Sequence, residues 1–179
     1  MLRTTLLFLA TLAAGTPAQE PTGWQVQESR APNDSVIEIT LLLRAESELR
    51  SRGTPVRPIL IIRCAEGRTE LGVYTGPYQP SGNQVHTVRY RLDRGRAVLA
   101  EWHESQGNRA VFHPNPRLLL SDLAITKLML FEYSNYEGAR VIARFPTEGL
   151  DEHLPRVTEA CGWGDASPRG SVPAREPIP

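Results

Sequence analysis

Short segments in which apolar and polar residues alternate recur along most of this chain, and they constrain its fold more than any other feature. A period of two residues puts apolar side chains on one face of a β-strand and polar side chains on the other. Expected strands lie at 24–26, 36–43, 59–64, 70–75, 85–92, 97–105, 110–113, 127–133 and 140–145. Gly, Asp and Asn residues separate many of them, which predicts antiparallel hairpins. The charged residues 44–56 are expected to form a surface connection.

Two further segments have the spacing of helices. Asn115 and Pro116 mark the start of a short amphipathic helix over 116–124, with Asn115 as its N-cap. A second helix is expected near the C-terminus, where Thr147 can serve as its cap and Pro155 should kink or split it. Its apolar stripe is formed by Leu150, Leu154, Val157 and Cys161. The chain is therefore expected to be mainly β, an antiparallel β-sandwich or a partly open barrel with two short helices.

The 179 residues are expected to form one folded domain between two terminal segments. Residues 1–18 have the pattern of a secretory signal peptide, because Arg3 precedes an apolar run at 6–14 and small residues follow it. A buried N-terminal helix is the alternative. Residues 19–164 should form the β-rich domain, and the Pro-rich residues 165–179 a disordered tail. No later segment has the length of an apolar membrane span, so we expect a periplasmic or secreted protein.

The chain has two cysteines, Cys64 and Cys161. An even pair in an exported protein indicates a disulfide, which here would close a loop of about 100 residues. The alternation of 59–64 and the helical stripe that ends at Cys161 both direct the sulfur atoms toward the core. A catalytic cysteine and a metal ligand are the competing interpretations, and neither has a local motif. The C-terminal helix should therefore be linked to a central strand.

Composition and motifs argue against several classes of function. Lys and Arg together number 20, as do Asp and Glu, so neither general nucleic-acid binding nor polybasic membrane binding is expected. The sequence contains no P-loop, Rossmann glycine motif, serine-hydrolase elbow or HExxH zinc motif. The histidines lack the spacing of a zinc pair; they are His86, His103, His113 and His153. No cofactor or metal is expected.

One segment, Trp102–Ser105, combines an acid, a base and a hydroxyl group. Adjacent strand residues point to opposite faces, so these side chains cannot form a hydrogen-bonded triad, and Trp102 is expected in the core or in a groove. A small hydrolase that uses Asp93, Glu101 or Glu104 is a further hypothesis, and it would need two converging carboxylates. The main expectation is a protein that is not an enzyme.

Four arginines alternate with apolar residues on expected strands, namely Arg89, Arg91, Arg140 and Arg144. If these strands are neighbours, the arginines form a basic patch that can bind an anionic polymer or an acidic protein. A solvated sheet face is the ordinary alternative. These arginines and Trp102 are the candidate binding surface. A glycan-binding groove would instead need an exposed aromatic residue, for which the candidates are Tyr74, Tyr78 and Trp163.

Several short segments, in their order and spacing, resemble the VasI/TagO-like family of type VI secretion-associated accessory proteins. They are Trp24, Pro32–Ser35, Ile61–Cys64, Tyr90–Asp93, Trp102–Ser105, Ala143–Leu150 and Ala160–Trp163. The resemblance covers about residues 24–163, and the chain departs from the family in the loop at 76–83 and in the tail. It implies a signal peptide, a β-rich periplasmic domain, the Cys64–Cys161 pair and Trp102 as a typical aromatic residue.

The same resemblance implies an exported accessory protein that binds envelope proteins, secretion-apparatus proteins or peptidoglycan. A generic periplasmic module that binds a glycan or a small ligand is the alternative. The resemblance supplies no catalytic residues for this sequence.

Overall fold

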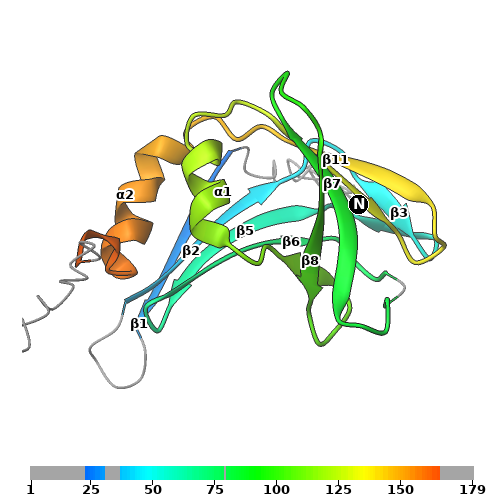
Figure 1. Ribbon diagram of the computed structural model, residues 1–179, viewed down its shortest axis with the longest axis horizontal. Helices are drawn as coiled ribbons and strands as arrows, with labels where there is room; N and C mark the ends of the chain where they lie inside the picture. The colour runs from blue at the N-terminus through cyan, green and yellow to red at the C-terminus, as the bar shows by residue number, and fades with distance from the viewer. Residues whose placement is uncertain (1–22, 31–36, 79, 166–179) are drawn as a thin grey trace, which may run out of the picture.

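The computed structural model describes residues 23–30, 37–78 and 80–165. Within these ranges the chain forms eleven strands, two α-helices and one 3-10 helix (Figure 1). The strands are β1 (Gln25–Arg30), β2 (Ile37–Arg44), β3 (Leu49–Ser51), β4 (Thr54–Val56), β5 (Ile59–Ala65), β6 (Arg68–Tyr74), β7 (Val85–Leu92), β8 (Val98–Glu104), β9 (Ala110–Phe112), β10 (Met129–Ser134) and β11 (Arg140–Phe145). The helices are α1 (Pro116–Leu123), α2 (Leu150–Ala160) and the 3-10 helix Trp163–Asp165.

Nine strands form one sheet in the order β1-β2-β5-β6-β9-β8-β7-β10-β11, and every neighbouring pair is antiparallel. The sheet is strongly curled, so that β7 and β8 cross over the strands of the other half (Figure 1). Strands β3 and β4 form a separate hairpin. The prediction of a mainly β, antiparallel fold is confirmed, and most expected strands lie within a few residues of the observed ones.

The two edges of the sheet come close together at one end. The indole Nε1 of Trp24, just before β1, donates a hydrogen bond to the carbonyl oxygen of Thr147, just after β11, at 3.3 Å. The backbone N–H of Glu46, after β2, donates to the carbonyl oxygen of Arg144 in β11 at 2.9 Å. One continuous sheet whose edges meet in this way corresponds to the partly open barrel of the two predicted architectures.

The inside of the curl is filled by the apolar side chains that the alternation predicts. In β10, for example, Met129, Phe131 and Tyr133 point inward and are buried, whereas Leu130 and Glu132 point outward. The same cluster contains inward residues of the other half of the sheet, among them Leu41, Leu43, Leu60, Ile62, Leu71 and Val73. The helix α1 adds its buried face to this core with Leu119, Leu120 and Leu123.

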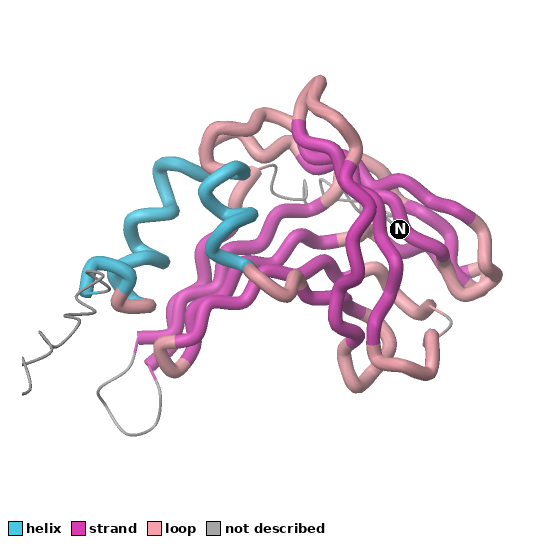
Figure 2. The backbone as a smooth tube through the Cα atoms, in the orientation of Figure 1, coloured by secondary structure: helices cyan, strands magenta, loops and turns pink. Residues whose placement is uncertain are grey.

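Both helices lie at the same end of the curled sheet (Figure 2). Helix α2 packs against β2 and β5 through buried Leu150 and Val157. Cys161, the residue after α2, forms a disulfide with Cys64 of β5, and their Cα atoms lie 5.6 Å apart. The predicted link between the C-terminal helix and a central strand is therefore confirmed, because β5 pairs with β2 on one side and β6 on the other.

Several local predictions are wrong. Residues 44–56 are not a plain connection, because they contain the β3–β4 hairpin. Thr147 does not cap α2, since its hydroxyl donates to the carbonyl oxygen of Thr126 at 2.7 Å and Gly149 occupies the N-cap position. Of the kink or split expected at Pro155, the split is wrong, because α2 runs unbroken through this residue. The expected N-cap position of Asn115 in α1 is confirmed, and its side chain makes no capping hydrogen bond.

Some expectations fall outside the described residues. They concern the signal peptide at 1–18, the turn at 32–35 and the tail, of which the structure describes only residue 165, at the end of the 3-10 helix. Among the residues that are described, no helix has the length and apolar character needed to cross a membrane.

Candidate binding site

The predicted arginines meet on one outer face of the sheet. Strand β10 lies between β7 and β11, and it faces Arg89 and Arg91 of β7 on one side and Arg140 and Arg144 of β11 on the other. All four arginines are exposed, and their inward neighbours are the core residues of the same strands. Side chains at alternate positions share a face, so the four arginines form one surface. We call the surface formed by these four arginines with Leu99, Glu132 and Ile142 the arginine face.

The charges on the arginine face are only partly compensated. Arg140 lies 3.5 Å from Glu132 of β10, and Arg144 lies 2.8 Å from Glu46. Arg89 and Arg91 have no ion pair within the described part of the chain, although Arg89 sits opposite Glu132 in the strand register. The two arginines of β7 are therefore available to an acidic group outside the chain.

Exposed apolar side chains lie beside these charges. Leu99 of β8 is opposite Arg89 in the register and is 66% exposed, and Ile142 of β11 is opposite Glu132 and is 46% exposed. Two shallow depressions of about 240 and 200 Å³ lie on this face, and both are lined in part by Arg89 and Glu132. The arginine face is thus a mixed surface of positive charge and apolar area.

Trp102 does not belong to this surface. Its side chain points inward from β8 and is completely buried. The centre of its ring lies 5.0 Å from the ring centre of Phe131 and 5.1 Å from that of His113. The proposal that Trp102 contributes to a binding surface is corrected by this burial, because no partner can reach the ring; its role is that of a core aromatic residue.

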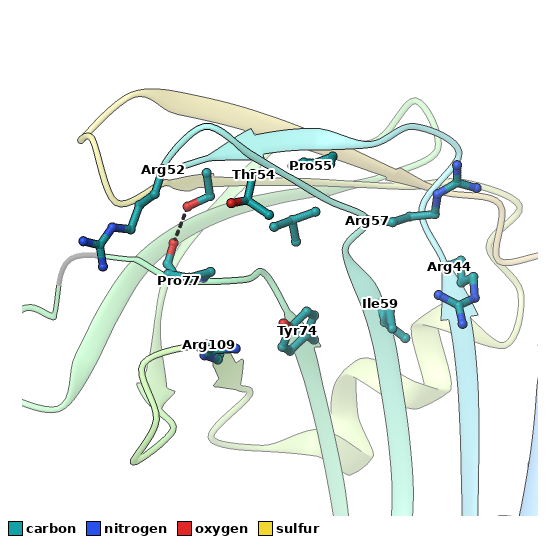
Figure 3. A pocket seen from close by; sticks show the side chains of 11 residues that line it. Arg44, Arg52, Thr54, Pro55, Arg57, Ile59, Tyr74, Pro77 and Arg109 are labelled. Atoms are coloured by element: carbon teal, nitrogen blue, oxygen red, sulfur yellow. Dashed lines mark hydrogen bonds between the residues drawn. The ribbon is translucent and has the colours of Figure 1, made fainter.

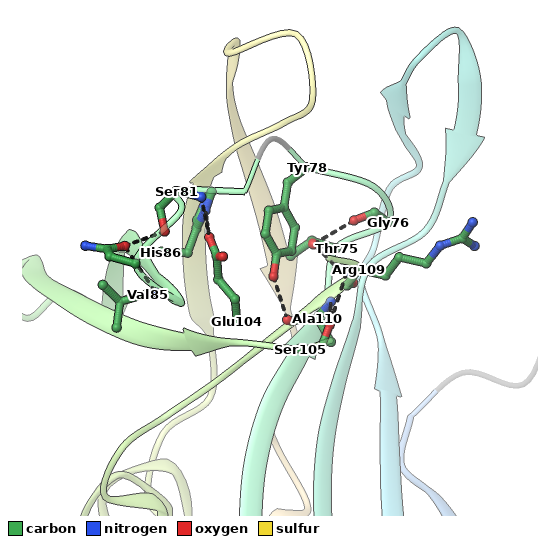
Figure 4. Close-up of polar contacts among 11 residues, drawn as sticks. Thr75, Gly76, Tyr78, Ser81, Val85, His86, Glu104, Ser105, Arg109 and Ala110 are labelled. Carbon is green, nitrogen blue, oxygen red and sulfur yellow. Dashed lines mark hydrogen bonds and ion pairs between the residues drawn. The ribbon is translucent and has the colours of Figure 1, made fainter. Parts of the chain in front are cut away.

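The Trp102–Ser105 segment also separates its polar groups as the alternation requires. His103 points outward and is exposed, whereas Glu104 points inward and its carboxylate Oε1 lies 3.4 Å from Nδ1 of His86 (Figure 4). The same oxygen accepts a hydrogen bond from the backbone N–H of Ser81 at 3.0 Å. The ring centres of Tyr78 and His86 lie 4.6 Å apart. This buried cluster of His86, Glu104 and Tyr78 was not anticipated from the sequence.

Burial raises the pKa of Tyr78 to about 12, and the nearby charge of Glu104 adds to the rise. The unfolded tyrosine titrates near 10.0, so between these pH values the unfolded chain loses a proton that the folded chain keeps. The stability contributed by this group is complete below pH 10 and is lost as the pH rises toward 12. We expect the free energy of unfolding of the wild type to fall by about 2 kcal/mol more than that of Tyr78→Phe over this range.

Urea titrations at a series of alkaline pH values, followed by tryptophan fluorescence, measure this difference. Tyr78→Phe keeps the ring against His86 and removes only the titrating hydroxyl and its 3.0 Å hydrogen bond to the Ala110 carbonyl oxygen. Parallel pH profiles for the two proteins would contradict the assignment.

The candidate hydrolase carboxylates do not converge. Asp93 lies after β7, where its Oδ1 accepts the backbone N–H groups of Lys127 and Leu128 at 3.0 and 2.9 Å. Glu101 is exposed on the outer face of β8, and Glu104 is on the inner face of the same strand. The described residues also contain no group of three or more His, Cys, Asp and Glu side chains that could hold a metal ion.

A groove separate from the arginine face runs beneath the β3–β4 hairpin (Figure 3). Its volume is about 570 Å³, and Tyr74 of β6 lies on its floor together with Ile59. Of the three candidate groove aromatics, Tyr74 lines this groove, Tyr78 is buried, and Trp163 is half-buried with its Nε1 bonded to Thr69 Oγ1 at 2.8 Å. The groove arginines were missed because they come from segments that only the folded sheet brings together; they are Arg44, Arg52, Arg57 and Arg109.

No protein-family model matches the chain. Over 98 residues the chain is 28% identical to an L-prolyl-(peptidyl-carrier protein) dehydrogenase of Serratia sp. (strain ATCC 39006), a match that covers 54% of this chain and 23% of that enzyme. The chain thus spans less than a quarter of the curated relative that it matches.

Among solved structures, the chain is similar to the invasion associated protein b from Bartonella henselae. The TM-score is 0.50 at 14% sequence identity, and the similarity covers 78% of this chain and 95% of that protein. At this identity the likeness concerns the fold alone.

Proposed function

We propose that this chain is an exported accessory protein without enzymatic activity, and that it works by docking an acidic envelope protein on the arginine face. The observation that carries the proposal is that Arg89 and Arg91 have no ion pair among the described residues and lie beside exposed Leu99. Arginines next to accessible apolar side chains are typical of the energetic centres of protein interfaces.

The rigidity of the surface supports the same proposal. The arginines project from β7 and β11, which both pair with β10 between them, and the inner sides of these three strands are anchored in the core by Val88, Phe131 and Ala143. A partner that binds such a surface does not have to order a flexible loop, so less binding free energy is spent on conformational entropy. An acidic partner also gains a faster association rate from the opposite charge.

Two features support export and a place in the cell envelope. Disulfides form and persist in oxidising compartments, and this chain has one between Cys64 and Cys161. The apolar run at 6–14 in the sequence has the pattern of a secretory signal. The resemblance to the VasI/TagO-like family supports a partner in a type VI secretion apparatus, so we expect the partner to be a protein of that apparatus.

The charge-reversed variant Arg89→Glu/Arg91→Glu tests the proposal. It should lose at least tenfold of the partner recovered by cross-linking and affinity purification from the envelope of the native host, because two attractive contacts become repulsive. The wild-type partner should be acidic, and its recovery should fall as the salt concentration rises.

Arg68→Glu is the matched control. Arg68 is an exposed arginine at the start of β6, at the turn after β5, and it lies outside the arginine face. Its reversal should leave recovery of the partner unchanged. Equal recovery with the wild type and with Arg89→Glu/Arg91→Glu would rule out docking on the arginine face.

A further inference from the structure

The groove under the β3–β4 hairpin has a floor that is built by strand register. Arg44 of β2 pairs with Ile59 of β5, and Ile59 pairs with Tyr74 of β6, so these three side chains form one row on the outer face (Figure 3). Tyr74 pairs in turn with Ala110 of β9, and Arg109 precedes this residue. Two arginines therefore lie at opposite ends of an apolar and aromatic floor, and their backbones are about 14 Å apart by three strand spacings.

The hairpin forms the roof of the groove and is held in place by specific contacts. Ser51 of β3 donates a hydrogen bond from its hydroxyl to the carbonyl oxygen of Pro77 at 2.8 Å, a contact drawn in Figure 3. The carbonyl oxygen of Arg50, also in β3, accepts a hydrogen bond from Nδ2 of Asn135 at 3.2 Å. The groove is thus a preformed feature of the fold, and its volume of about 570 Å³ lies in the range of ligand pockets.

The charged side chains in the lining of the groove are all arginines, which only donate hydrogen bonds. None of its residues is acidic. The Nε atom of Arg44 is buried and has no hydrogen-bond partner in the described structure. Arg57 lies 3.6 Å from Glu48, outside the lining, and the guanidinium of Arg52 lies over the ring of Tyr136. A guanidinium can only donate hydrogen bonds, so the ligand that fits must supply acceptors, and charged acceptors above all.

The rest of the lining is mainly apolar. It consists of the Tyr74 ring together with Pro55, Val56, Ile59 and Pro77, and of the two hydroxyl-bearing residues Ser51 and Thr54. A small inorganic anion would leave this area uncovered. A molecule with a ring face for Tyr74 and anionic groups on both sides of the ring would use the whole groove.

We propose that this groove binds a short saccharide segment that carries carboxylate or phosphate groups, with a sugar ring on Tyr74 and anionic groups at Arg44 and Arg109. This site goes beyond the proposed function, and its lining shares no residue with the arginine face, which is on β7, β8, β10 and β11. Failure of one proposal therefore leaves the other intact.

Calorimetric titration of the full-length chain tests the site with four probes. They are trigalacturonate, glucose 1,6-bisphosphate, neutral maltotriose and inorganic phosphate. Trigalacturonate or glucose 1,6-bisphosphate should bind, with the difference between them distinguishing carboxylate from phosphate as the source of the negative charge, and affinity should fall with added salt. Maltotriose should bind at least tenfold more weakly than the better anionic sugar. Inorganic phosphate that binds as tightly as both sugars would overturn the saccharide assignment, and so would the absence of binding by both.

Three variants connect binding to the groove. Arg44→Gln should lower the affinity for the anionic sugar about tenfold, as expected for the loss of one charge-assisted hydrogen bond. Tyr74→Ala should lower this affinity by a similar factor through loss of the ring, whereas Tyr74→Phe should retain most of it. Arg63→Gln is the control, because Arg63 is on the same outer face of β5 but outside the groove, paired with Glu70 at 3.0 Å. Affinity that is unchanged in both Arg44→Gln and Tyr74→Ala would place the sugar elsewhere and overturn the proposal.

Discussion

Cys64→Ser is expected to lower the free energy of unfolding by about 4 kcal/mol in oxidising buffer. The disulfide joins residues that are 97 positions apart in the sequence, so it restricts most of the domain in the unfolded state. In the folded state it fastens the end of α2 to β5, where the helix otherwise depends on Leu150 and Val157. Urea unfolding followed by tryptophan fluorescence measures the change as a shift of the midpoint at constant slope.

The partner substitution provides the control for this prediction. Cys161→Ser should lower the free energy of unfolding by a similar amount. The double variant should be little less stable than either single variant, because each substitution removes the same bond. A reducing agent should lower the midpoint of the wild type toward that of the variants and leave the variants unchanged. An unchanged midpoint for Cys64→Ser would contradict the disulfide.

Trp102→Ala is expected to destabilise the domain by about 4 kcal/mol, because a large ring leaves a cavity in a well-packed core. The ring is completely buried between Phe131 and His113. Leu99, on the same strand, faces outward, and Leu99→Ala should change the free energy of unfolding by no more than about 0.5 kcal/mol. Urea titrations of the two variants under identical conditions compare the inner and outer faces of β8 directly.

For partner binding we expect the reverse: the side chain at position 99 should matter and the one at position 102 should not. Leu99→Ala should reduce recovery of the acidic partner while the protein stays fully folded. Trp102→Phe, which keeps an aromatic ring in the core, should retain binding with a smaller loss of stability than Trp102→Ala. A stable Trp102→Ala protein, or a strongly destabilised Leu99→Ala protein, would show that the faces of β8 are assigned the wrong way round.

The strands could be predicted because each carries its own pattern. Residues 59–64 alternate between Leu60, Ile62 and Cys64 on one face and Ile61 and Arg63 on the other, and the structure places them in a central strand with this orientation. The β3–β4 hairpin was missed because its short strands have little apolar alternation. It is held by contacts to Pro77 and Asn135, which are far away in the sequence.

The errors at helix α2 have a similar cause. Thr147 is a suitable capping residue by type, but tertiary structure gives its hydroxyl another partner, the Thr126 carbonyl oxygen. Pro155 removes one backbone donor, whose acceptor would be the carbonyl oxygen of solvent-exposed Asp151. A single lost bond near water is tolerated when Leu150 and Val157 anchor the helix on both sides of the proline.

The candidate sites were predictable only in part. Alternation alone directs Arg89, Arg91, Arg140 and Arg144 outward, but their union into one face depends on β10 pairing with both β7 and β11. The groove depends on still more distant pairings, which align Arg44 with Ile59 and Tyr74. The His86–Glu104 contact likewise follows from the β7–β8 register, which no local motif specifies.

Site-specific photo-cross-linking most directly tests the central claim that the arginine face is the docking surface. A photo-reactive residue at position 99 is compared in the native envelope with one at position 118, because Leu118 on α1 is equally exposed, at 63% against 66%, and lies outside the arginine face. We predict that the acidic envelope protein cross-links at position 99 and not at 118, and that Arg89→Glu/Arg91→Glu abolishes the product. Cross-linking at 118 alone, or a product at 99 that survives the charge reversal, would contradict it.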